Sequence, residues 1–103
     1  MFKDEAKTTV KSILRVRRML LQKRIGNQST FVVSAFERTE RLMQTYQYNS
    51  DELMARFLII HANDLAAIIP GYRSKCSLRL SEQLYTLINQ SYQILTTNAK
   101  AIS

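Results

Sequence analysis

The chain has 103 residues, of which 46% are hydrophobic and 22% are charged, and its net charge is +7. This length and composition predict one ordinary globular domain, and they exclude both a disordered tail and a chain with two separate cores. Only two Gly and one Pro are present. Because these turn residues are too few for an all-β fold of many strands, we expect an all-α protein.

The counts of cysteine and histidine limit the chemistry. The single Cys76 excludes an intrachain disulfide, and one histidine leaves no ligand set for a zinc site, so we expect no metal and no cofactor. No apolar run reaches the roughly 20 residues that cross a bilayer, so we expect no transmembrane segment. An unpaired cysteine fits a reducing compartment, and we expect a cytoplasmic protein.

The first two predicted helices cover residues 4–24 and 30–47. Apolar residues of the first recur at a helical spacing, and Gly26-Asn27 ends it. Ser29 or Thr30 is the expected cap of the second helix. Its expected buried face consists of Phe31, Val32, Ala35, Phe36, Thr39, Leu42, Met43 and Tyr46.

The third and fourth predicted helices cover residues 51–69 and 77–98. The third opens either on a capping box of Asn49 with Glu52 or on a Ser50 cap, and Pro70-Gly71 ends it. The fourth has an apolar seam at Leu80, Leu84, Leu87, Ser91 and Ile94. Short connections favour antiparallel neighbours, so the sequence predicts a single-domain, antiparallel, up-down-up-down four-helix bundle.

Positive charge is concentrated near the start of the chain. The first 26 residues hold eight Lys or Arg against two acids, whereas the rest holds seven against six. A four-residue spacing gathers some of these cations into a stripe on the first helix. Up-down packing would bring the turn after the first helix to the same end as the turn between the third and fourth helices. The expected nucleic-acid contacts are Lys7, Lys11, Arg15, Arg18, Lys23, Arg24, Tyr72, Arg73, Lys75 and Arg79.

Other interpretations of these cations stay open. They also fit a solvated surface that complements a helix dipole, a membrane surface, or an acidic protein partner. The chain has no RNA-recognition, KH, zinc-finger or helix-turn-helix signature. The expected partner is therefore nucleic acid or another anionic surface, on the basis of charge alone.

A second candidate surface is uncharged. No charged residue occurs between Gln83 and Ala99, and interface cores are depleted of Lys, Glu and Asp and enriched in Tyr. We expect this surface to contact a protein or a second copy of the chain, although amides also simply solvate helices. Its predicted residues are Tyr46, Tyr48, Gln83, Thr86, Asn89, Gln90 and Gln93.

Candidates for catalysis are few. A helical bundle with one mid-helix histidine resembles histidine phosphotransfer domains in outline, but Asp64 and Leu65 stand where those domains carry Lys and Gly. The helical spacing instead places His61 among apolar residues, as a hydrogen-bonded core histidine. Cys76 has no second histidine to activate it, and the acids are scattered. We expect no enzyme.

The sequence thus predicts a small basic binding or regulatory protein that contacts nucleic acid. The alternative is a protein-interaction module that uses the uncharged face of the fourth helix, such as an inhibitor, a secretion chaperone or a bacteriocin-immunity-like protein. Small basic bundles of this size resemble bacteriocin immunity proteins in architecture, with no motif shared residue by residue.

Overall fold

The computed structural model describes residues 1–71 and 74–102, and every regular element in them is an α-helix. The helices are α1 (Phe2–Gln22), α2 (Thr30–Thr45), α3 (Asp51–Ile60), α4 (Ala62–Ile68) and α5 (Lys75–Ile102). They pack around one core, and the predicted all-α class is confirmed.

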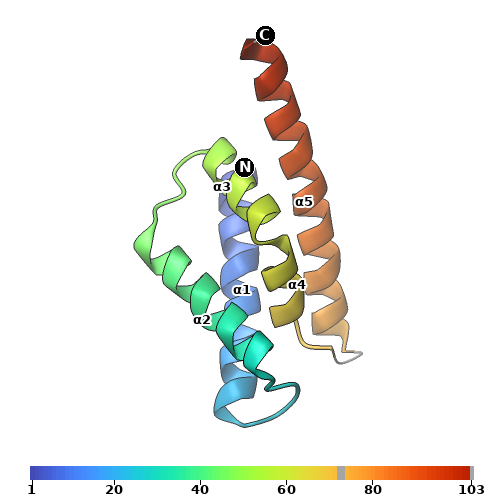
Figure 1. Cartoon of the computed structure of the whole chain (residues 1–103). Helices are drawn as coiled ribbons and strands as arrows, with labels where there is room; N and C mark the ends of the chain where they lie inside the picture. Colours follow the sequence, from blue (N-terminus) through green and yellow to red (C-terminus); the bar gives the residue numbers. More distant parts are fainter. Residues whose placement is uncertain (72–73, 103) are drawn as a thin grey trace.

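The helices alternate in direction along the long axis of the molecule. In Figure 1, α1 runs downward, α2 returns upward, α3 and α4 run down in succession, and α5 returns upward. The molecule measures 49 × 28 × 21 Å along its three principal axes. The last turns of α5 extend beyond the other helices and contribute to the longest of these extents (Figure 1).

The predicted third helix, residues 51–69, is two helices in the structure, and that prediction was wrong. His61 lies between them with φ −106° and ψ 18°, outside regular helical geometry. The reason for the break is tertiary, because α3 packs mainly on α5 whereas α4 packs mainly on α2. The change of direction lets each half meet its own neighbour, and such packing overrides intrinsic helix propensity.

The helix starts follow local capping chemistry. Ser29 Oγ accepts a hydrogen bond from the backbone N–H of Val32 at 3.3 Å, and Ser50 Oγ accepts one from that of Leu53 at 3.1 Å. Each serine satisfies an N–H group that has no partner inside its helix. The starts of α2 and α3 were therefore predictable to the residue.

Other helix boundaries differ from the prediction by one to four residues. Helix α1 covers Phe2–Gln22 instead of residues 4–24, and Arg24 after it has a left-handed φ of 55°. Helix α2 ends at Thr45, two residues early, while α5 covers Lys75–Ile102 instead of residues 77–98. Helix ends are the least certain feature of any pattern because they depend on side-chain caps and fraying.

The core draws buried apolar side chains from all five helices. The largest contribution to it from α1 is Val10, Ile13 and Leu14, which belong to the same buried cluster as Leu58, Leu65 and the α5 seam of Leu80, Leu84 and Leu87. Two expected core residues of the second helix are instead at the surface, since Phe31 is 59% and Tyr46 is 57% exposed. They lie at the two ends of α2, where few neighbouring helices can cover them.

One of the cations of α1 is part of the core. Arg17 is 1% exposed. Its Nε donates a hydrogen bond to the carbonyl oxygen of Ile68 at 2.8 Å, and its Nη1 donates one to that of Asn27 at 3.1 Å. The Ile68 carbonyl is at the end of α4, where helix carbonyls lack an intrahelical partner. Arg17 therefore ties α1 to α4 and to the connection between α1 and α2.

Candidate binding surfaces

The predicted cationic stripe on α1 keeps three of its four residues in the structure. Lys11 and Arg15 are exposed and Lys7 is half-buried, and none of the three forms an ion pair with a described carboxylate. Arg18, by contrast, is paired with Glu40 of α2, and its guanidinium carbon lies 5.8 Å from the ring centroid of Phe36. Arg18 consequently holds two helices together and presents less charge to a ligand.

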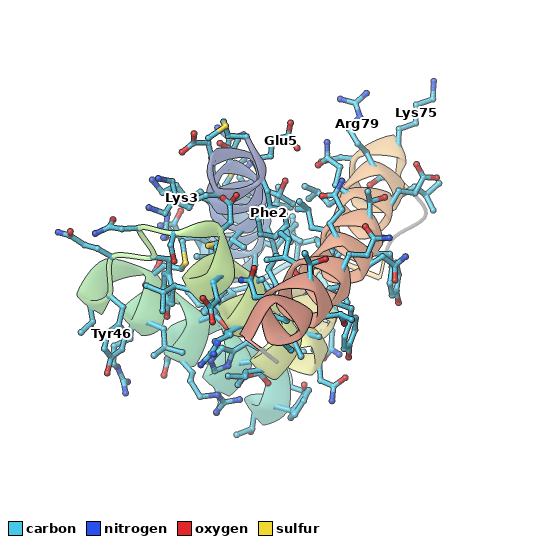
Figure 2. The ribbon with its side chains drawn as sticks, turned by 90° about the horizontal axis from the view of Figure 1, so that it is seen from above. Phe2, Lys3, Glu5, Tyr46, Lys75 and Arg79 are labelled. Carbon is cyan, nitrogen blue, oxygen red and sulfur yellow. The ribbon has the colours of Figure 1, made fainter. Side chains whose placement is uncertain are left out.

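The two basic connections lie at the same end of the molecule. Figure 1 places both the α1–α2 connection and the α4–α5 connection at the lower end. Lys23 and Arg24 follow α1 directly and are exposed, as are Lys75 and Arg79 in the first turns of α5. In Figure 2, however, Lys75 projects from α5 away from α1, whereas Arg79 lines the depression between α1 and α5. The predicted contacts Tyr72 and Arg73 lie outside the described residues.

Backbone hydrogen bonds fix the segment that carries Lys23 and Arg24. The N–H of Lys23 donates to the carbonyl of Met19 at 3.1 Å, and the N–H of Ile25 donates to that of Leu20 at 2.8 Å. The chain thus ends α1 with its backbone paired and its basic side chains in solvent. We call Lys7, Lys11, Arg15, Lys23, Arg24, Lys75 and Arg79 the cationic surface.

The uncharged face of α5 borders two adjoining depressions. The first, of about 590 Å³, lies between α1 and α5, and the second, of about 510 Å³, lies where α1, α3 and α5 meet. The predicted interface residues Gln83, Thr86 and Gln90 line the first, and Gln90 and Gln93 line the second. Together the two depressions form one open groove along α5.

The remaining predicted interface residues lie elsewhere. Asn89 is exposed on α5 but does not line either depression. Tyr46 and Tyr48 belong to the connection between α2 and α3, and Figure 2 shows Tyr46 on the side of the molecule opposite α5. The structure therefore brings four of the seven predicted residues to one surface and separates the other three from it.

Carboxylates, which the sequence pattern did not place at this surface, line the groove. Five of the eight acidic residues of the chain do so, namely Asp4, Glu5, Asp51, Glu52 and Glu82. We call this feature the acidic groove. In Figure 2, Glu5 and Phe2 point from α1 toward α5, whereas Lys3 lies on the other side of α1.

Two helix N-termini meet at this groove, which explains most of its charge. The backbone N–H of Lys3 donates to the Asp51 carboxylate at 3.1 Å, and Lys3 Nζ donates to the carbonyl of Asn49 at 3.2 Å. These bonds hold the start of α1 against the start of α3. Acids are favoured in the first turn of a helix because they complement its dipole. Glu82 lies beyond the first turn of the long helix α5 and has no such role.

A row of ring contacts runs from the segment between α2 and α3 to His61. Ring centroids are 6.3 Å apart for Tyr46 and Tyr48, 4.7 Å for Tyr48 and Phe57, and 4.9 Å for Phe57 and His61. Burial, followed by the nearby Tyr46, raises the pKa of the Tyr48 hydroxyl. His61 was expected at the centre of the buried face, but it is half-buried at the junction of α3 and α4.

The surroundings of His61 favour its neutral form. Burial is the largest cause and lowers its pKa from the ordinary 6.5, the positive charge of Arg38 lowers it further, and Asp64 opposes both. Arg38 Nε and Nη2 donate to the two Asp64 carboxylate oxygens, each at 3.0 Å, and this hydrogen bonding raises the pKa of Arg38. This pair therefore fixes α2 to α4 beside the histidine.

The lowered pKa of His61 predicts a specific dependence of stability on pH. Below about pH 6.5 the unfolded chain binds a proton at His61 more readily than the folded protein does, so acidification favours unfolding. The stabilisation is present at neutral pH and is lost as the pH falls below the ordinary histidine pKa. Thermal unfolding followed between about pH 7.5 and pH 5.5 should give a shallower pH dependence for His61→Gln than for the wild type. Identical dependences for the two proteins would contradict this assignment.

No group of three or more His, Cys, Asp or Glu side chains in residues 1–71 and 74–102 gathers to hold a metal ion. Cys76, expected in a loop, is exposed in the first turn of α5. Among the described helices, none combines the length and the apolar character needed to cross a bilayer.

Comparison with known proteins adds no assignment to this geometry. The chain matches no protein-family model, no curated protein and no solved structure.

Proposed function

We propose that this chain is a non-enzymatic binding protein that contacts nucleic acid through the cationic surface. One observation carries the proposal: no side chain of this surface forms an ion pair with a described carboxylate, on a chain whose net charge is +7. Ion pairs do occupy Arg18, Arg38 and Arg56, so the cations left over are concentrated on α1 and at one end of the molecule.

The spacing of the cations favours a linear polyanion. Lys7, Lys11 and Arg15 are four residues apart, which corresponds to steps of about 6 Å along the axis of α1. A row of charges at this interval suits a chain of phosphates, since each neutralised phosphate releases counterions. The exposed Lys23 and Arg24 continue the row past the end of the helix.

The arrangement of the helices is compatible with a single nucleic-acid surface formed by α1 and the start of α5. If α3 and α4 are counted as one interrupted helix, the five helices correspond to an up-down-up-down four-helix bundle. In such a bundle the two basic connections share one end, and Lys75 and Arg79 extend the surface that begins on α1.

Salt dependence tests the proposal directly. Binding of fluorescently labelled single-stranded and double-stranded oligonucleotides to the full chain should weaken linearly on logarithmic axes between about 50 and 200 mM salt. If all seven cations contact phosphates, the slope for a duplex should approach about −6. Absence of binding at about 50 mM salt, or an affinity that does not change with salt, would overturn the proposal.

The acidic groove favours a second candidate function. A protein-interaction module, of the kind found in inhibitors, secretion chaperones or immunity proteins, would use the uncharged face of α5. Gln83, Thr86, Gln90 and Gln93 line this groove and carry no charge that would have to be desolvated.

A further inference from the structure

We propose that the acidic groove binds an amphipathic helix of a partner protein, with Lys or Arg on the edges of its apolar face. This binding site is separate from the cationic surface, except at Arg79, and it requires no nucleic acid. It therefore gives the protein a second kind of partner.

The groove has the length of a helix-binding site. Residues of α5 from Arg79 to Asn98 line its two parts, and at 1.5 Å per residue this span corresponds to about 28 Å. Glu5 and Gln90 line both parts, so the two depressions are continuous. A helix of about 18 residues could lie along the whole groove.

The lining combines an apolar floor with amide walls. Phe2, Leu87 and Ile94 supply apolar surface, and Gln83, Gln90 and Gln93 stand beside them without charge. An amphipathic helix lays its apolar side chains into such a groove and keeps its polar side chains at the edges. The floor can be desolvated at low cost, because the long uncharged stretch of α5 places no ion in it.

The charges specify a cationic occupant. Five carboxylates line the groove against one cation, Arg79. Among the described residues, Asp4, Glu5 and Glu82 form no ion pair, whereas Glu52 is paired with Arg56 four residues later. Three carboxylates thus face the groove with their charge available to Lys or Arg on a partner.

The distribution of these charges also sets the direction of the occupant. Asp51 and Glu52 line the part of the groove where α1, α3 and α5 meet, and Arg79 lines only the other part. The cationic end of the partner helix should lie against α3. Its opposite end, near Arg79, should be neutral or acidic.

Helix dipoles provide a competing explanation for part of the charge. Asp4, Glu5, Asp51 and Glu52 lie in the first turns of α1 and α3 and would stabilise those helices without any ligand. Glu82 has no such structural role, and neither does the uncharged stretch of α5. Substitutions should therefore include Glu82, and stability must be measured beside binding.

The test uses two synthetic peptides of about 18 residues, a Leu/Lys amphipathic helix and its Leu/Glu counterpart, each with a fluorescent label. The full-length protein should bind the Leu/Lys peptide and not the Leu/Glu peptide. The Glu5→Lys/Glu82→Lys protein should bind the Leu/Lys peptide at least about tenfold more weakly. Glu37→Lys is the matched control, since Glu37 is exposed on α2 and does not line the groove.

A second variant keeps the test decisive if the charge reversals disturb folding. Thr86 is exposed and lines the first depression. Thr86→Trp should fill the groove and weaken binding of the Leu/Lys peptide, while the circular dichroism spectrum of the protein stays unchanged. Equal binding of the two peptides, equal losses for Glu37→Lys and Glu5→Lys/Glu82→Lys, or full binding by Thr86→Trp would each overturn the proposal.

Two further measurements separate this proposal from other outcomes. The Glu5→Lys/Glu82→Lys protein should keep or increase its affinity for oligonucleotides, so failure of peptide binding and failure of nucleic-acid binding are distinguishable. Light scattering tests whether the occupant is a second copy of the chain. If the wild type is a dimer and Glu5→Lys/Glu82→Lys makes it a monomer, the groove binds a second copy of the chain. This outcome would overturn the proposal of a partner helix.

Discussion

Replacing Arg17 with alanine should lower the free energy of unfolding by about 3 kcal/mol. The side chain is 1% exposed and donates hydrogen bonds to the carbonyl oxygens of Ile68 and Asn27 at 2.8 and 3.1 Å. Hydrogen bonds from a charged donor contribute more than neutral ones, and the two carbonyls would be left without that donor. The aliphatic stem of Arg17 also fills space between α1 and α4, which alanine cannot do.

Urea unfolding followed by circular dichroism would measure this loss, with Arg15→Ala as the matched control two residues earlier. Arg15 is exposed and forms no ion pair with a described carboxylate, so its replacement should change the stability by no more than about 0.5 kcal/mol. Arg17→Met restores most of the packing but none of the hydrogen bonds, and should recover only part of the loss. If Arg17→Ala were as stable as Arg15→Ala, Arg17 would not hold α1 to α4 in solution.

Neutralising two cations of α1 should weaken nucleic-acid binding strongly. In the double variant Lys11→Gln/Arg15→Gln, two phosphate contacts are lost, and each contributes about 0.9 to the slope of log affinity against log salt. The magnitude of the slope for a duplex should therefore fall by about 2, and the affinity at about 0.1 M salt should fall about 60-fold. The loss should be similar for different sequences, because phosphates carry no sequence information.

The control for this experiment is Arg41→Gln on α2. Arg41 is exposed and forms no ion pair with a described residue, but it lies outside the cationic surface. Its replacement should leave the salt dependence nearly unchanged. Equal effects of Arg41→Gln and of Lys11→Gln/Arg15→Gln, after correction for the number of charges, would indicate diffuse attraction to the net charge of +7.

The features that local chemistry determines were predictable from the sequence. Ser29 and Ser50, each one of two caps that the sequence offered, cap the helices that follow them, because a serine before an apolar helical pattern can accept hydrogen bonds from the first free N–H groups. The scarcity of Gly and Pro correctly predicted an all-α protein. The seam of α5 was also correct at Leu80, Leu84 and Leu87, which are at most 5% exposed.

The features that depend on packing between helices were not predictable. Nothing in the sequence around His61 marks a break, because no Gly or Pro is near it and the cause is the different neighbours of α3 and α4. Arg17 follows the same periodicity as the apolar residues of α1, and that spacing could have indicated its burial. The pairing of Arg18 with Glu40 requires the position of α2 relative to α1.

The candidate surfaces divide in the same way. The cations of α1 could be placed on one side of the helix from their spacing alone, and so could the uncharged residues of α5. The acidic groove could not be predicted in this way, since its carboxylates come from three helices that are far apart in the sequence. The approach of the starts of α1 and α3, held by the bonds from Lys3 to Asp51 and Asn49, brings four of them together, and the packing of α1 on α5 adds Glu82.

Helix α1 packs against each of the other four described helices, as α4 also does, and the chain crosses between the α3–α5 and α2–α4 pairs at His61. Without α1, only the chain at His61 and the contacts of α4 with α3 and α5 would join the two pairs, so cooperative unfolding depends in large part on α1. A ligand that binds α1 in the folded protein only would raise the melting temperature of the entire molecule, and not of one pair alone.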